Sequence, residues 1–338
     1  MASQPDTDLA DYLPIYLDAL CIDTVLDFDL YLDMQGTLVL YREKNLAFGE
    51  NNRRHLIENQ VDRLYVSKTE KAKYQQYIEA SLDKIIADEK IPELSKAEIV
   101  YQTSKNLVEE VFENPRLGDN IARSQTMVTH MINYILRSRE AFAHILQITS
   151  FDYRTYTHSV NVCTFTIALA QRMDLISQEI LHELGIGALL HDIGKSRVDP
   201  KILKKPGALT AAEFEQVKNH PQWGAEILGE TNLIPQKSYY PVLQHQERMD
   251  GSGYPRGLSR HQIHLYGRIT GLCDTFDALT TRRVYKDALD SFPALKIIKD
   301  MPEKYDQDIL HEFITLIGPE AVAPTTPEPI PREVVTIL

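Results

Sequence analysis

The sequence is poor in cysteine and has no long apolar run, and each scarcity excludes a class of protein. Its three cysteines, Cys21, Cys163 and Cys273, lie far apart and form no CxxC pair, which argues against a disulfide scaffold and for a reducing compartment. No uninterrupted apolar stretch reaches the ~20 residues that cross a bilayer, and no basic-then-apolar signal region opens the chain. We therefore expect a cytoplasmic protein with inert core thiols.

Basic residues are outnumbered by acidic ones. The 36 Lys and Arg against 48 Asp and Glu give a formal net charge of -12, so the overall field repels nucleic acid and anionic membranes. An anionic ligand must then meet a local positive site. At 338 residues, 43% of them hydrophobic, the chain can bury a sizeable core and is expected to divide into two domains.

Residues 1–92 predict a small mixed α/β domain. Apolar residues alternate imperfectly from Phe28 to Arg42 and are interrupted at Gln35-Gly36, the pattern of a β-hairpin. The polar stretch Asn51 to Asn59 is expected to be helical, and Thr69 to Asp88 carries apolar residues at helical spacing. Nothing in this domain indicates chemistry, and its tyrosines are expected to pack the core.

Beyond Pro92 the pattern is helical. The periodicity continues to about Ile317 with almost no strand-like alternation. We expect connecting helices over 93–150, an all-α bundle over 151–322 and, because of four prolines, an extended arm over 323–338. The predicted fold class is therefore α+β, with a small N-terminal mixed α/β domain followed by an all-α helical bundle.

Two histidines extend the apolar stripes of predicted helices. His158 shares a face with Val162 and Phe165 on a helix that follows Thr155, so the imidazole points into the interior. His191 continues the stripe of the next helix, at its buried end, with Asp192 beside it.

A third histidine is placed by local helix signals. Thr210 with Glu213 three residues on is a capping box, which predicts a helix start. We expect that helix to end at His220, because Pro221 disfavours helical geometry in the residue before it.

The last two candidates flank a glycine-rich loop. His245 follows a short apolar helix and precedes the loop Asp250 to Pro255. Asp274 lies on a helix face made by Gly267 and Gly271, where small residues let another helix or a ligand approach closely.

These groups are more informative together than singly. A lone inward histidine is more often a hydrogen-bonded core residue than a metal ligand. Four imidazoles with Asp192 and Asp274 would be costly to bury unpaired, whereas one cationic centre satisfies them all. Ligands about one helix and a loop apart are typical of a bundle-core site and unlike a zinc finger. Such mixed ligation suits iron, manganese or zinc, and Asp192 can give one oxygen to each of two metals, as in phosphate-ester hydrolysis.

Five stretches of the helical half follow one another in a recognisable order: His191-Asp192-Ile193-Gly194-Lys195, Lys205-Pro206-Gly207, His220-Pro221, Glu247 to Pro255, and Asp274 to Thr280. From about Asp152 to Lys286 the chain resembles the HD-GYP subgroup of the HD phosphohydrolase superfamily. The resemblance implies an all-helical HD-type domain that hydrolyses the bacterial second messenger cyclic di-GMP to pGpG, or onward to GMP, in signal transduction. A hydroxide bridging two metals would be the nucleophile.

The resemblance also implies roles for individual residues. One metal would be held by His158, His191, Asp192 and Asp274, and the second by Asp192, His220 and His245. Asp192 and Lys195 would be catalytic, with Lys195 also steadying the phosphate. Lys195, Tyr254, Arg283 and Lys286 would bind the substrate.

Two positions depart from the family pattern. The family usually has two adjacent histidines where this chain has His245-Gln246. Gln246 is at best a weak ligand, because a neutral amide oxygen binds transition metals less tightly than imidazole. Members with three metals have a glutamate where this chain has Arg154. We therefore expect two divalent transition-metal ions, iron or manganese ahead of zinc or nickel, and no third.

Other functions stay open at this point. A cyclic-dinucleotide receptor with weak or no catalysis is one alternative, and an HD phosphohydrolase for another cyclic nucleotide is the second. The N-terminal domain would be a regulatory or dimerisation element, which leaves a homodimer open. The resemblance adds GGDEF-type domain proteins as partners, and no nucleic-acid or membrane partner is expected.

Overall fold

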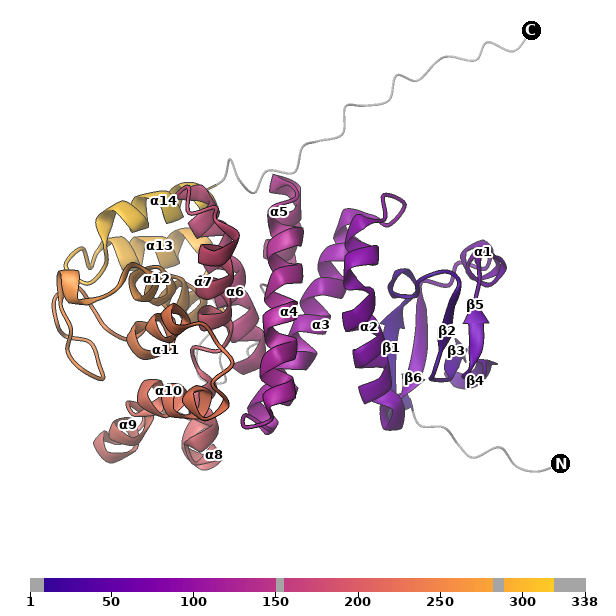
Figure 1. Cartoon of the computed structure of the whole chain (residues 1–338), viewed down its shortest axis with the longest axis horizontal. Helices are drawn as coiled ribbons and strands as arrows, with labels where there is room; N and C mark the ends of the chain where they lie inside the picture. Colours follow the sequence, from indigo (N-terminus) through magenta and orange to yellow (C-terminus); the bar gives the residue numbers. More distant parts are fainter. Residues whose placement is uncertain (1–8, 150–154, 282–288, 319–338) are drawn as a thin grey trace, which may run out of the picture.

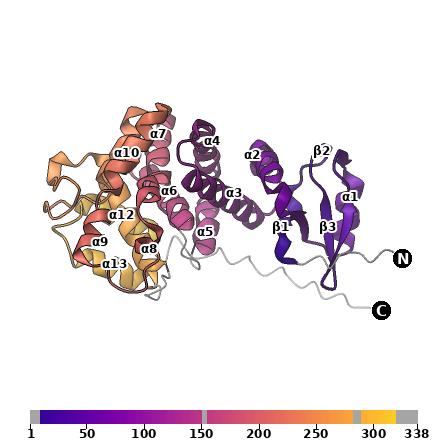
Figure 2. The same ribbon diagram turned by 90° about the horizontal axis from the view of Figure 1, so that it is seen from below.

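The computed structural model describes residues 9–149, 155–281 and 289–318. The chain forms an elongated molecule with a small β-structure at one end, helices α2 to α5 in the middle and the remaining helices at the other end (Figure 1). The view from below keeps the same order (Figure 2). The arm predicted over 323–338 lies outside the described residues.

The β-structure has two antiparallel sheets. One contains four strands in the order β1-β6-β3-β4 and the other pairs β2 with β5. The strands are β1 (Tyr12–Tyr16), β2 (Thr24–Leu26), β3 (Leu30–Met34), β4 (Thr37–Arg42), β5 (Leu46–Phe48) and β6 (Arg63–Ser67), with α1 (Glu50–Glu58) before β6. The predicted hairpin is β3 and β4. Gln35 and Gly36 form its turn with φ of 59° and 89°, as the favoured two-residue turns require.

Helix α2 (Lys71–Ala87) is the helix predicted over Thr69 to Asp88, and it turns Tyr74, Ile78 and Leu82 into the core. Pro92 is the N-cap of α3 (Glu93–Glu113), so the predicted interruption is a short connection between two helices that pack on each other. Buried apolar residues of the sheet, the middle helices and the far helices form one continuous cluster.

The rest of the described chain is helical, which confirms the predicted fold class. After Ser67 its only β-pairing is an isolated bridge between Asp250 and Ser259. The α-helices are α4 (Gly118–Ile135), α5 (Arg139–Ile148), α6 (Thr155–Arg172), α7 (Gln178–Leu189), α8 (Pro200–Leu203), α9 (Ala211–Val217), α10 (His220–Thr231), α11 (Tyr239–Gln244), α12 (Leu265–Thr280), α13 (Ser291–Lys299) and α14 (Gln307–Ile317). Among the described residues, no helix combines the length and apolar character that a membrane crossing needs.

The expected helix end at His220 is wrong. The capping box at Thr210 and Glu213 is present, but α9 ends at Val217 and His220 is the first residue of α10. Pro221 lies in the first turn of α10, where a missing N–H is harmless because those amides have no partner within the helix. The proline therefore marks the start of a helix rather than the end of one.

Candidate metal centre

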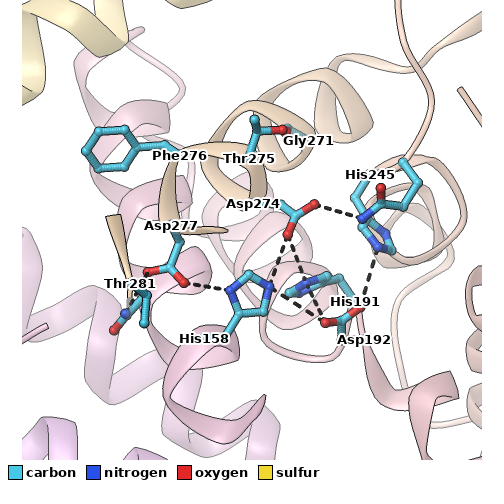
Figure 3. Close-up of polar contacts among 12 residues, drawn as sticks. His158, His191, Asp192, His245, Gly271, Asp274, Thr275, Phe276, Asp277 and Thr281 are labelled. Atoms are coloured by element: carbon cyan, nitrogen blue, oxygen red, sulfur yellow. Dashed lines mark hydrogen bonds and ion pairs between the residues drawn. The ribbon is translucent and has the colours of Figure 1, made fainter. Parts of the chain in front are cut away.

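The six predicted ligands converge on one buried place. Figure 3 shows five of them together, and the sixth, His220, lies against Asp192. They come from five segments: His158 from α6, His191 and Asp192 from the end of α7, His220 from the start of α10, His245 from the end of α11, and Asp274 from α12. Asp274 is 6% exposed and the others are at most 1% exposed. The structure thus brings together every one of the predicted imidazole and carboxylate ligands.

Two glycines let these segments come close enough. A Cβ on Gly271 of α12 would lie 2.7 Å from the carbonyl oxygen of His245. A Cβ on Gly194, in the 3-10 helix η4 (Ile193–Arg197), would lie 1.9 Å from the carbonyl oxygen of His220. Larger residues would push the ligand-bearing backbones apart.

Asp192 divides the histidines into two groups. Its Oδ1 lies 3.2 Å from Nε2 of His220 and 3.6 Å from Nε2 of His245. Its Oδ2 lies 3.6 Å from Nε2 of His158 and 3.5 Å from Nε2 of His191. The first group, His158, His191 and Asp192, and the second group, Asp192, His220 and His245, could each hold a metal ion. Asp274 adjoins the first group, with Oδ1 3.0 Å from Nε2 of His158.

All four histidines face the centre with the same ring nitrogen. Each Nδ1 donates a hydrogen bond away from it, and the acceptors are Asp277 Oδ2 for His158 (2.6 Å), Ala188 O for His191 (2.7 Å), Val217 O for His220 (2.7 Å) and Pro241 O for His245 (2.9 Å). A carbonyl can only accept, so the Nδ1 of His191, His220 and His245 carries the proton. In the neutral rings Nε2 then carries the lone pair that a metal needs.

These nitrogens and oxygens fit a bound cation. Nε2 of His220 and Nε2 of His245 are 3.0 Å apart, so two lone pairs face each other. Two nitrogens at right angles on one metal, each at ~2.1 Å, would be ~3 Å apart. Nε2 of His191 and Oδ1 of Asp192 are buried without a hydrogen-bond partner, an arrangement that is costly unless a cation satisfies them.

The electrostatics favour the metal-binding forms of the carboxylates. Burial by itself would raise the pKa of Asp192, but Lys195 and the neighbouring histidines outweigh it and hold the pKa well below its usual range. The pKa of Asp274 is lowered in the same way, because contacts with His158 outweigh the effect of burial. Both side chains are therefore ionised.

The two histidine groups differ in charge. Burial lowers the pKa of His245 to about 4, which keeps its imidazole neutral. Burial also opposes a charge on His158, but the carboxylates of Asp274 and Asp277 outweigh it and raise the pKa of His158 well above its usual value. Without a metal, the first group therefore attracts a proton to His158.

Sequence reasoning missed Asp277 as a site residue. Its Oδ2 accepts from His158, and its Oδ1 accepts from Asn161 Nδ2 (2.7 Å) and Thr281 Oγ1 (3.1 Å). The sequence spacing could have indicated this role, because Asp277 is three residues after Asp274 and therefore lies on nearly the same helix face. A carboxylate that accepts from a ligand histidine fixes the orientation of its ring.

Glu247 was quoted in a motif but given no role. It is 4% exposed, and its two carboxylate oxygens accept from the backbone N–H groups of Arg256 and Leu258, each over 2.8 Å. The glycine-rich loop is thereby tied to the residue that follows His245-Gln246.

The other predicted site residues fall into two sets. Lys195 contacts Oδ2 of Asp192, the ring of Tyr254 lies 6.1 Å from that of His220, and Gln246 Nε2 donates to Asp274 Oδ2 over 2.9 Å. These three residues therefore lie at the centre. Arg283 and Lys286, and Arg154 from the third-metal argument, lie outside the described residues.

The helical half matches a known family. A family model described as HD domain covers residues 141–309, half of the chain. The chain belongs to the HD domain family. The match confirms that the motifs were correctly recognised as those of an HD domain. The family membership and the two groups of candidate ligands together support divalent metal binding.

The chain is similar in sequence to two proteins named as cyclic di-GMP phosphodiesterases. The chain is 35% identical over 228 residues to a cyclic di-GMP phosphodiesterase of Pseudomonas aeruginosa, covering 67% of this chain and 55% of the relative. It is 38% identical over 167 residues to a cyclic di-GMP phosphodiesterase of Thermotoga maritima, covering 49% and 45%. The chain therefore spans about half the length of the curated relatives it matches.

A solved structure matches nearly the whole fold. The HDG"Y"P protein from Bdellovibrio bacteriovorus aligns with a TM-score of 0.64 at 22% identity, over 91% of this chain and 99% of the other. At this identity the match shows a shared fold, and the alignment extends well beyond the HD domain.

Proposed function

We propose that this HD domain protein is a metal-dependent phosphodiesterase that hydrolyses cyclic di-GMP to pGpG. The observation that carries the proposal is the position of Asp192, whose two oxygens face two separate histidine groups. Two metals held in this way activate water and polarise a phosphodiester. The relatives from Pseudomonas aeruginosa and Thermotoga maritima support the substrate.

In this proposal the two groups hold one ion each. His158, His191, Asp192 and Asp274 hold the first ion, and Asp192, His220 and His245 hold the second. Imidazole and carboxylate ligands favour iron or manganese, with zinc or nickel as alternatives. We propose no third ion, because Arg154 stands where family members with three metals have a glutamate.

The chain's own residues would prepare the substrate. Lys195 lies against Asp192, so its ammonium group can stabilise negative charge that develops on the phosphate or on the departing 3′ oxygen. Tyr254 lies beside His220, on the loop that Glu247 anchors. We propose that this loop forms one wall of the dinucleotide groove and that Arg283 and Lys286 bind a second phosphate.

The test is turnover by the full chain. Protein loaded anaerobically with iron or manganese should convert cyclic di-GMP to pGpG, which chromatography separates from GMP and from the substrate. Metal-free protein is the control. Binding of the dinucleotide with no product at any metal loading would overturn the enzyme proposal and favour a receptor. If the protein hydrolyses another cyclic nucleotide in preference to cyclic di-GMP when both are present, that nucleotide is the substrate instead.

The remaining proposals concern residues 1–92. We propose a regulatory or dimerisation role for this part of the chain. For the protein as a whole we propose GGDEF-type proteins as partners and a cytoplasmic location. A cavity of about 220 Å³ between β1 and α3 supports a regulatory role, because aromatic and amide-bearing residues are among those that line it: Tyr16, Tyr74, Gln102 and Asn106.

A further inference from the structure

A buried hydrogen-bond chain connects the first group to α3. Tyr101 on α3 donates from Oη to Asn161 Oδ1 over 2.8 Å. Asn161 on α6 donates from Nδ2 to Asp277 Oδ1 over 2.7 Å. Asp277 on α12 accepts from His158 Nδ1 over 2.6 Å (Figure 3). Tyr101 is 7% exposed, and the other three residues are at most 1% exposed.

We propose that Tyr101 is a positioning residue of the metal centre, which acts on His158 through Asn161 and Asp277. The inference rests on the proposed function only in that the first group holds a metal. Within the part of the chain that the structure describes, Tyr101 hydrogen-bonds to Asn161 and to none of the six candidate ligands, so its role is to fix the groups between.

The hydrogen bonds in this series all run one way, from donor to acceptor, on each side of Asn161, because the asparagine amide has an accepting oxygen and a donating nitrogen. The hydroxyl of Tyr101 donates to the oxygen end of Asn161, which leaves the nitrogen end to donate to Asp277. With both ends satisfied, the Asp277 carboxylate has a fixed position from which to accept the proton on His158 Nδ1. Buried polar networks of this kind define one arrangement only when every member is satisfied.

Loss of the tyrosine hydroxyl would affect the far end of this chain. Oδ1 of Asn161 would lose this donor in a place where the side chain is 0% exposed, and an unsatisfied buried acceptor is destabilising. The amide would then be held only through its nitrogen, which donates to Asp277 Oδ1 and, over 3.5 Å, to the carbonyl oxygen of Thr149. The position of Asn161, and with it that of the Asp277 carboxylate, would be less firmly defined. The imidazole of His158 would be held less firmly toward the metal.

The position of Tyr101 on α3 links this hydrogen-bond chain to the cavity beside β1. Ile99, Gln102 and Asn106 of the same helix line the cavity against β1. Helix α3 also packs on α6, which carries His158 and Asn161. Tyr101 is therefore the point at which a shift of α3 against α6 would reach the ligand set.

The experiment compares two tyrosine variants. Tyr134 on α4 is fully buried and donates to the backbone carbonyl of Glu93 over 3.0 Å, so Tyr134→Phe removes a similar hydrogen bond without a link to the centre. Mn²⁺ binding to metal-free full chain is titrated by calorimetry. The step that is absent in His158→Ala is assigned to the first group.

We expect Tyr101→Phe to weaken the first-group step about tenfold, the low end of the range for groups that orient metal ligands. The second-group step should be unchanged, and Tyr134→Phe should match wild type in both. A merely structural role for Tyr101 would weaken both steps together or neither, and either result overturns the inference.

A second variant covers the case in which Tyr101→Phe does not fold. Asn161→Leu breaks the same chain at its middle member with a side chain of similar size. Its first-group affinity should fall at least as far, and an unchanged value overturns the inference. Wild-type protein that binds no Mn²⁺ at all would instead overturn the proposed function.

Discussion

Gln246 donates from its side-chain nitrogen to Oδ2 of Asp274 over 2.9 Å. In the HD-GYP pattern that the sequence resembles, a second histidine occupies this position. An amide nitrogen that donates has no lone pair to offer a metal, so in this arrangement Gln246 holds Asp274 in place rather than acting as a ligand through that atom.

The first prediction concerns this position. Gln246→His should raise the metal content that survives dialysis, because an imidazole nitrogen binds a transition metal more tightly than an amide does. Elemental analysis after dialysis measures the change. Gln246→Ala is the control, since it removes the hydrogen bond to Asp274 without supplying an imidazole. If the histidine variant retains no more metal than wild type, residue 246 does not reach the ions.

The second prediction concerns the residue shared by the two groups. Asp192→Asn keeps the side-chain shape but removes the charge, so metal should be lost from both groups and turnover should fall by more than about 1,000-fold. His191→Ala should also abolish turnover. The circular dichroism of both should stay helical, because the apolar stripe of α7 is unchanged.

A surface carboxylate provides the matched control for Asp192. Asp83 pairs with His130 over 2.9 Å, but its side chain is 72% exposed. Asp83→Asn should leave metal content and turnover at the wild-type level. Wild-type activity in both Asp192→Asn and His191→Ala would rule out the proposed ligand set.

The third prediction is a pH dependence of the metal-free protein. Burial lowers the pKa of His245 to about 4, against about 6.5 for an ordinary imidazole. As the pH falls from about 6 to about 4.5, the unfolded chain binds a proton here that the folded protein does not. The free energy of unfolding should therefore fall with pH, by up to about 1.4 kcal/mol per pH unit from this group.

His158 does not obscure this slope. Its pKa lies well above the usual value, so across the same window it is protonated in the folded and the unfolded protein. Urea unfolding of chelator-treated wild type and His245→Gln isolates the contribution of His245. Equal slopes in the two proteins would contradict the depressed pKa.

The fourth prediction concerns close packing. A Cβ on Gly194 would lie 1.9 Å from the carbonyl oxygen of His220 and 2.5 Å from the backbone nitrogen of Gly224, so η4 and α10 must separate in Gly194→Ala. We expect a loss of about 1 to 3 kcal/mol in the free energy of unfolding, together with weaker metal binding by the second group. Thermal denaturation and Mn²⁺ titration measure the two effects.

Gly229 is the control, because it lies in an exposed part of α10. A Cβ there would meet Tyr239 Oη at 4.0 Å, which is ordinary contact. Gly229→Ala should therefore stabilise the protein by about 0.5 to 1 kcal/mol through the higher helix propensity of alanine. If Gly194→Ala and Gly229→Ala change the free energy of unfolding and Mn²⁺ binding alike, the contact at Gly194 does not constrain His220.

The local elements were predictable wherever short-range chemistry decides them. The hairpin turn at Gln35-Gly36 and the capping box at Thr210 are set by backbone conformations and side-chain hydrogen bonds within a few residues. The start of α10 was not predicted correctly. Pro221 is compatible with the first turn of a helix as well as with a position after one, and the local sequence does not distinguish the two.

The sequence by itself determined that His158, His191 and Asp274 face the interior, because each lies on a helix face that its apolar or small neighbours define. Only the tertiary structure decided how Asp192 shares its two oxygens between the groups and how Tyr101 is linked to His158. Those relationships join residues far apart in the sequence, such as His158 and Asp277, which are 119 positions apart. Their geometry follows from how the helices pack. The periodicity of the sequence relates only neighbours along one helix, so it does not predict this geometry.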